Sequence, residues 1–296
     1  RDGYSSMYKK EITLTSLSPL GEKVEEWILK GAFITTTNFG DLDWSQEEVV
    51  TIDLTLRYDQ KQTSKFPANI ITLPSNGNVY AETSALRNGK IEMRHMTAYD
   101  EDILSNSSYI KEGVIFNKLL EALIVTPNVN IDELTSGDKE WLIISARILG
   151  YGVEYEVVVT NPETKEPTTG TMDLSKLNHK LFDLVSDENG YFDYTISNTK
   201  DVIKFKYLNS IDQFNINSEK LTSSFLKVSI QSVNGKTSPQ EIEDYLKYDF
   251  KAIDSRKFKK HIIETAPSID YNIKVIGADG DTIDATFQFN ADLFWF

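Results

Sequence analysis

Residues 48–58, EVVTIDLTLRY, alternate between apolar and polar side chains over most of their length. The apolar side chains that share one face are those of Val50, Ile52, Leu54 and Leu56. The opposite face carries Val49, Thr51, Asp53, Thr55 and Arg57. Because the side chains of a β-strand point to opposite faces in turn, this pattern predicts a strand with one dry side.

Two more strands are predicted upstream. Residues 11–17 alternate in the same way and end at the turn-forming sequence SPLG. Residues 26–39 are rich in the β-branched and aromatic side chains that fit a pleated surface, and GDLD at 40–43 breaks the pattern. We therefore expect residues 1–58 to form an antiparallel β module, with open edges and an apolar face that its own strands do not cover.

Residues 59–69 have the composition of a linker, with a gap in the chain at this place as the open alternative, and predict a boundary before a second domain over residues 70–296. The helices expected in that domain cover residues 97–104, 111–125, 138–149, 239–250 and 254–265. The strands expected there cover residues 70–74, 79–80, 90–94, 153–159, 169–174, 191–197, 202–207, 270–276 and 282–289. The predicted fold class is α+β, a β module followed by a mixed domain of helices and β-hairpins.

Composition limits the function. The 296 residues carry 31 Lys and Arg against 45 Asp and Glu, a net charge of -14, which argues against a surface that coats nucleic acid. The absence of cysteine excludes disulfides, thiolate zinc sites, iron–sulfur clusters and cysteine nucleophiles. No apolar run is long enough for a membrane helix and no secretory signal opens the chain, so a soluble protein is predicted. The first residue is not Met, which suggests that the chain begins partway into a longer product.

Motifs for catalysis and for cofactor or metal binding are missing. His95, His179 and His261 are the only histidines, and none are spaced as metal ligands on a helix. The acidic turn around Gly280 lacks the ligand set of a calcium loop. Carboxylates are so plentiful that close pairs such as Asp100 with Asp102, or Glu154 with Glu156, do not by themselves indicate acid–base catalysis. Glu154 and Glu156 alternate with Tyr155 and Val157 and are more typical of the solvated face of a strand. The basic stretch 256–261, next to Phe258, Ile262 and Ile263 as a dry side, is also more typical of a solvated helix face than of a phosphate site.

Residues 10–58 resemble the T-even-type phage tail tube family. The run WILKGAFIT at 27–35 is similar to that family's Trp-x-Leu-x-Asn-Ala-Phe motif, with Gly31 where the family usually has Asn. The turn at 40–43 and the strand at 47–56 resemble its closing strand. The resemblance implies the C-terminal part of a tail-tube β-sandwich and a place in a ring of subunits.

Residues 70–296 more distantly resemble the baseplate hub and hub-assembly proteins of such phages. The similar stretches are LPSNG at 73–77, MTAYDEDIL at 96–104, Asp138 with Arg147 and Tyr151-Gly152, and the aromatic C-terminus. Related proteins often carry Cys-x-x-Cys in the two hairpin turns that are NPET at 161–164 and GADG at 277–280 here, so a zinc role is not expected. The resemblance implies a virion or assembly role and supplies no catalytic residue.

A ring of subunits would cover the open edges and the apolar face of the β module. The residues expected at subunit interfaces are Trp27, Phe33, Val50, Ile52, Leu54, Leu56, Phe294, Trp295 and Phe296. For the last three, burial in the domain core and burial in a partner's groove are equally open alternatives. A negative lumen that includes Asp41, Asp43 and Asp53 would let genome DNA slide without binding it specifically.

The sequence thus predicts a structural component of a contractile phage tail, in the baseplate hub or at its junction with the tube. Its expected partners are other tube and hub proteins and copies of itself in a ring, with no cofactor, no metal and no membrane insertion. It is expected in the virion after assembly in the host cytoplasm. The alternatives are a baseplate assembly chaperone that leaves the particle, a tail-tip cell-wall hydrolase with an unrecognised pair of acids, and a monomeric ligand-binding module.

Overall fold

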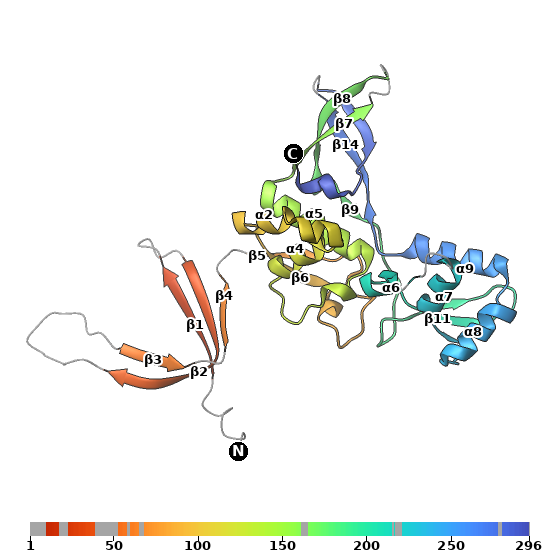
Figure 1. Ribbon diagram of the computed structural model, residues 1–296, viewed down its shortest axis with the longest axis horizontal. Helices are drawn as coiled ribbons and strands as arrows, with labels where there is room; N and C mark the ends of the chain where they lie inside the picture. Colours follow the sequence, from red (N-terminus) through yellow and green to blue (C-terminus); the bar gives the residue numbers. More distant parts are fainter. Residues whose placement is uncertain are drawn as a thin grey trace, which may run out of the picture. The chain divides into compact units, whose positions relative to one another are not determined.

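The computed structural model describes residues 10–17, 23–38, 53–57, 60–64, 68–160, 165–214, 216, 221–277 and 280–295. The chain divides into two units, residues 1–67 and residues 68–296, and each is described by itself. Helices and antiparallel strands in several small sheets make up the described residues, which confirms the α+β class (Figure 1).

The first unit is a sheet built around one long strand. β2 (Lys23–Asn38) pairs through its first half with β1 (Lys10–Leu17) on one side and β4 (Gln60–Ser64) on the other. Its second half pairs with β3 (Asp53–Arg57). The two halves meet at Gly31, whose φ of 65° is a left-handed conformation that residues with a Cβ rarely adopt.

Strand β4 corrects the predicted linker. Residues 60–64 were expected to connect two domains, but they pair with residues 26–30 of β2. Their sequence QKQTS is polar throughout, so it lacks the alternation by which a half-buried strand is recognised. A polar strand at the edge of a sheet therefore has the composition of a linker.

The second unit contains two hydrophobic cores, and the first core is built mainly on α4 and α5. Strands β5 (Ala68–Thr72) and β6 (Lys90–Arg94) form a hairpin that is followed by α2 (Ala98–Leu104), α3 (Ser107–Glu112), α4 (Ile115–Leu123) and α5 (Ser136–Tyr151). Thr97 caps α2 as predicted, in a reciprocal capping box with Asp100. The single helix predicted over 111–125 is wrong, because Gly113 ends α3 with a φ of 70° before α4 begins.

The two hairpins predicted around residues 162 and 280 form one sheet. β7 (Glu154–Thr160) pairs with β8 (Pro167–Asp173), and β14 (Asn272–Gly277) pairs with β15 (Thr282–Thr286). The antiparallel pairing of β14 with β8 joins them in the order β15-β14-β8-β7. Figure 1 shows this sheet projecting beyond α2, α4 and α5.

The second core is an insertion into the first. The chain leaves the first core at β9 (Asn178–His179) and returns at β13 (Ile269–Asp270), and these two short strands pair with each other. The elements between them are β10 (Phe192–Thr195), β11 (Val202–Phe205), α6 (Ser210–Phe214), α7 (Leu221–Ser229), β12 (Ile230–Val233), α8 (Pro239–Tyr248) and α9 (Ala252–Thr265). They enclose a separate aromatic cluster around Phe192, Phe205 and Phe258. No element was predicted for α6, α7 or β12.

Candidate interaction surfaces

The structure describes only part of the predicted interface in the first unit. Phe33 and Leu56 are half-buried and lie in the paired strands β2 and β3. The other predicted residues there are Trp27 and Leu54, whose backbones pair in β2 and β3, and Val50 and Ile52, which lie outside the described residues. Asp41 and Asp43 of the predicted lumen also lie outside them, as does the side chain of Asp53.

The aromatic C-terminus lies largely in the first core. Phe294 is 5% exposed and its ring centroid is 6.1 Å from that of Phe116 and 6.3 Å from that of Tyr151. Phe294 therefore fills the chain's own core, which decides between the two alternatives for this residue. Trp295 is 42% exposed and retains surface for a partner, and Phe296 lies outside the described residues.

Arg147 fixes this C-terminal segment to α5. Its side chain is buried, and its guanidinium donates hydrogen bonds to the backbone carbonyls of Leu293 at 3.1 Å, Gly152 at 3.1 Å and Glu154 at 3.3 Å. One side chain thus ties the C-terminal segment at Leu293 to the residues that directly follow α5. Arg147 and Tyr151-Gly152 were recognised in the sequence as similar stretches, and their role here is structural.

Asp138, in the first turn of α5, binds the LPSNG stretch at 73–77, which was recognised separately in the sequence. Its buried carboxylate accepts hydrogen bonds from the Ser75 N–H at 2.9 Å, the Ser75 hydroxyl at 2.6 Å and the Tyr80 hydroxyl at 2.5 Å. Burial raises the pKa of Asp138, although these hydrogen bonds act in the opposite direction. Burial, followed by the neighbouring carboxylate, also raises the pKa of Tyr80. The network anchors the loop at 73–80 to the first turn of α5.

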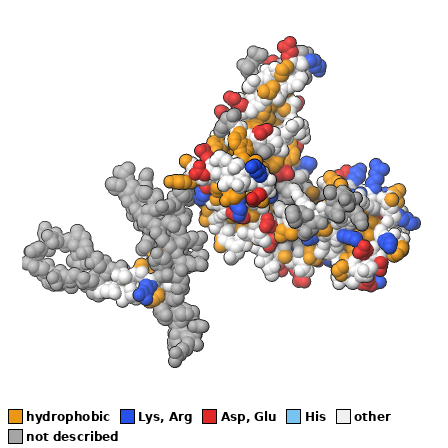
Figure 2. All heavy atoms as spheres, in the orientation of Figure 1, with side chains coloured by type: hydrophobic (Ala, Val, Ile, Leu, Met, Phe, Trp, Pro, Cys, Tyr) orange, Lys and Arg blue, Asp and Glu red, His pale blue; other side chains and the backbone are white. Residues whose placement is uncertain are grey.

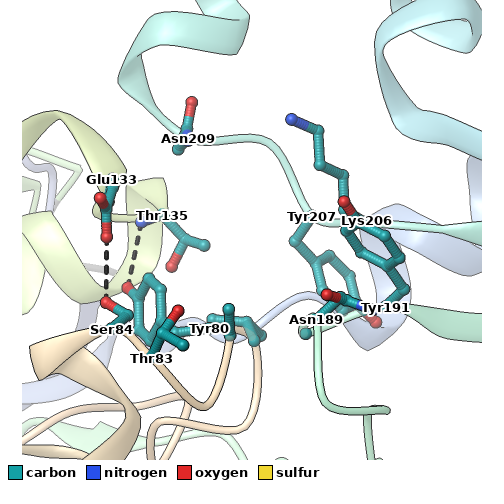
Figure 3. Close-up of a pocket in the computed structure, with 13 residues that line it drawn as sticks. Tyr80, Thr83, Ser84, Glu133, Thr135, Asn189, Tyr191, Lys206, Tyr207 and Asn209 are labelled. Atoms are coloured by element: carbon teal, nitrogen blue, oxygen red, sulfur yellow. Dashed lines mark hydrogen bonds between the residues drawn. The ribbon is translucent and has the colours of Figure 1, made fainter.

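A polar pocket of about 310 Å3 lies between the two cores (Figure 3). Tyr80, Ser84, Glu133 and Thr135 line it from the first core, and Asn189, Tyr191, Lys206 and Tyr207 line it from the insertion. Many of its polar groups are paired within the chain. Ser84 donates to Glu133, the Thr135 N–H donates to the Tyr80 hydroxyl, and Lys206 forms an ion pair with Asp212. Each of these pairs lies within one core, so they shape the walls of the pocket and supply no contact from one core to the other.

Two of the histidines and the acid Asp100 make packing or ion-pair contacts within the chain. His179 stacks edge-on against Trp141, and His261 packs against Tyr194, with burial lowering the pKa of both imidazoles. Asp100 forms a bidentate pair with Arg94, while Asp102 is exposed. Within the described ranges, no group of three or more His, Asp or Glu side chains is placed to hold a metal ion.

The acidic face of β7 and the apolar side of α9 lie mostly as the sequence predicted. Glu154 and Glu156 are exposed on β7, and Phe258 and Ile262 are buried on the inner side of α9. Ile263 was predicted on that inner side but is 72% exposed, which corrects its assignment. Figure 2 shows Lys and Arg side chains on the surface around α7, α8 and α9. No described helix combines the length and apolar character that crossing a bilayer requires.

Comparison with known proteins identifies the second unit. The family model described as T4 bacteriophage base plate protein matches residues 68–295, a range that begins at the first residue of this unit. No curated protein and no solved structure matches the chain significantly. Since the matched range covers more than half of the chain, the protein belongs to the T4 bacteriophage base plate protein family and is a structural protein of the phage baseplate.

Proposed function

We propose that the protein occupies the baseplate hub or the junction between hub and tail tube, and that it acts through ring-forming contacts between protein subunits. The observation that carries this proposal is the division of the chain at Pro67. The family match begins just after that residue, and a separate antiparallel sheet precedes it. A baseplate domain joined to a β module is suited to connecting the baseplate to a ring of similar modules.

The conformation of Gly31 supports a tube-like role for the first unit. In the stretch that resembles the tail tube family, Gly31 stands where that family usually carries Asn. Gly and Asn are the residues that most readily adopt the positive φ found at this position. The departure from the family motif therefore keeps the backbone geometry of β2.

Open strand edges also support ring formation. Among the described strands of the first unit, β1 and β4 each pair with β2 alone, and so does β3. Each thus has an outer edge available to a neighbouring subunit. Ile34, which is 54% exposed next to these edges, adds apolar surface that a neighbour could cover.

Electron microscopy of intact particles tests the proposal. A compact tag inserted after Arg1 should give extra density arranged in a ring at the axis of the baseplate. Density at the periphery of the baseplate, or without rotational symmetry, would contradict the hub position. Absence of the protein from purified particles would instead assign it the role of an assembly factor that leaves the structure.

A further inference from the structure

Each outer strand of the sheet in the first core, β7 and β15, is paired on one edge only. In the part of the chain that the structure describes, β7 pairs only with β8, and β15 pairs only with β14. β7 contains neither Pro nor Lys, and its pairing with β8 has no bulge. Pro, Lys and bulges are common devices that protect a strand edge, and β7 lacks all three. The Glu154 carbonyl is occupied by Arg147, so the edge that β7 offers to another strand spans residues 155–160.

The two free edges face one cavity. Residues 155–160 of β7 and residues 283–288 at β15 line the same opening, which has a volume of about 570 Å3. Consecutive residues line it on both sides, whereas a side-chain face would contribute only alternate residues. The edges of the two strands, with their backbone N–H and C=O groups, therefore border the opening.

Gly170 allows β14 to approach β8 closely in the middle of the sheet. Gly170, in the middle of β8, is buried and pairs with Val157 on one side and Gly277 on the other. A Cβ at Gly170 would lie 2.4 Å from Cγ1 of Val275, so a larger residue would force the strands apart.

The chemistry of the lining indicates what the cavity accepts. Val157 and Val159 of β7 and Ala285 of β15 are only half-buried, and they form an apolar floor together with buried Met172 and Ile283. The charged side chains of the lining are all acidic, namely Glu156, Asp284 and Asp292. Figure 2 shows apolar and acidic side chains side by side on the visible face of this sheet.

We propose that this cavity is a strand-addition site for an extended segment of a partner protein in which apolar residues alternate with Lys or Arg. The segment pairs with the free edge of β7, its apolar side chains cover the floor, and its cations face the acidic rim. A second copy of β7 is the poorer occupant, because it would bring Glu154 and Glu156 close to carboxylates of the same kind. This inference rests on the proposed function in assembly and names one contact surface for it.

Binding of a synthetic peptide to the full chain tests the site. The probe is a fluorescent peptide of about nine residues in which Val alternates with Lys and Thr, long enough to span β7. Fluorescence anisotropy should detect saturable binding. Val159→Lys should weaken it about tenfold or more, since a charge on the floor loses hydration when the peptide covers it. Ile276→Lys is the matched control, because Ile276 lies on β14, does not line the cavity and is 60% exposed, and it should change affinity by less than about twofold.

Two altered peptides separate the causes of binding. N-methylation of alternate backbone amides should abolish binding if main-chain pairing carries it, and Glu in place of Lys should weaken it about tenfold by repulsion from the acidic rim. The proposal is refuted by absence of binding at millimolar concentration, by equal weakening in both variants, or by unaffected binding of the N-methylated peptide. Self-association of the chain that Val159→Lys alone removes would assign the edge to a second copy and also refute it. The position of the tag in particles tests the proposed function independently of these outcomes.

Discussion

Asp138 and Ser75 are 63 residues apart in the sequence and are joined by two hydrogen bonds, from the Ser75 N–H at 2.9 Å and from its hydroxyl at 2.6 Å, to the two oxygens of one buried carboxylate. Tyr80 donates a third hydrogen bond to the same group. All three partners are donors, so only a group with two acceptor oxygens satisfies them. This explains why a carboxylate is retained at a fully buried position.

Replacement of Asp138 by Asn should therefore destabilise the protein by about 2–4 kcal/mol, because the amide NH2 would face a donor. Urea denaturation of the full chain measures the loss. Asp102→Asn, at an exposed position, should change stability by no more than about 0.5 kcal/mol. Equal stability of Asp138→Asn and the unaltered protein would contradict the assignment of the network.

Asp100 should make stability depend on pH in the acid range. Burial acts to raise its pKa, but hydrogen bonds from Arg94 and Thr97 outweigh burial and lower the pKa below the ordinary value of 3.8. A carboxyl with a lowered pKa in the folded state contributes stability above its unfolded pKa and loses it as the pH falls through the folded pKa. The stability difference between the unaltered protein and Asp100→Asn should thus be constant near neutral pH and shrink below about pH 4.

Arg147→Met should release the C-terminal segment. Methionine keeps much of the volume but leaves the carbonyls of Leu293, Gly152 and Glu154 without this donor, at a cost of about 2 kcal/mol or more. Hydrogen exchange should increase most at residues 287–295. Arg256→Met, at an exposed position on α9, should leave exchange in that segment unchanged.

Gly137→Ala should be poorly tolerated although the position lies in a helix. An added Cβ would lie 2.1 Å from the carbonyl oxygen of Pro267, where the chain returns from the insertion. We expect a loss of about 1–3 kcal/mol, because backbone on both sides must shift. Gly113→Ala meets no atom within 4 Å and should cost only about 1 kcal/mol, through its positive φ. Thermal unfolding of the two variants makes the comparison.

Strands and helices with strong periodicity could be predicted from the sequence, and those without it could not. β6 begins and ends where it was predicted, and Ser238 with Pro239 placed the start of α8 correctly. No capping signal marks α7, whose buried side chain Leu226 packs in the second core. The turn sequence Asn234-Gly235 directly after β12 was a local signal that the prediction did not use. The strand β4 was missed because both of its faces are polar.

The interaction surfaces depend still more on tertiary contacts. The apolar ending predicted equally well a core segment and a partner contact, and only the placement of Phe294 beside Phe116 distinguishes them. The alternation in β7 predicted a half-buried strand. That its free edge faces β15 across a cavity follows from the pairing of β8 with β14, more than 100 residues along the chain, which no local pattern reveals.

The pairing of Asn178–His179 with Ile269–Asp270 has an evolutionary consequence. The chain enters and leaves the inserted subdomain through adjacent strands, so its two ends are as close as those of a tight hairpin. A recombination event that exchanged or removed this cassette would preserve the path of every strand in the host domain. Phages could therefore acquire new surface chemistry at this position while the remainder of the baseplate domain kept its architecture.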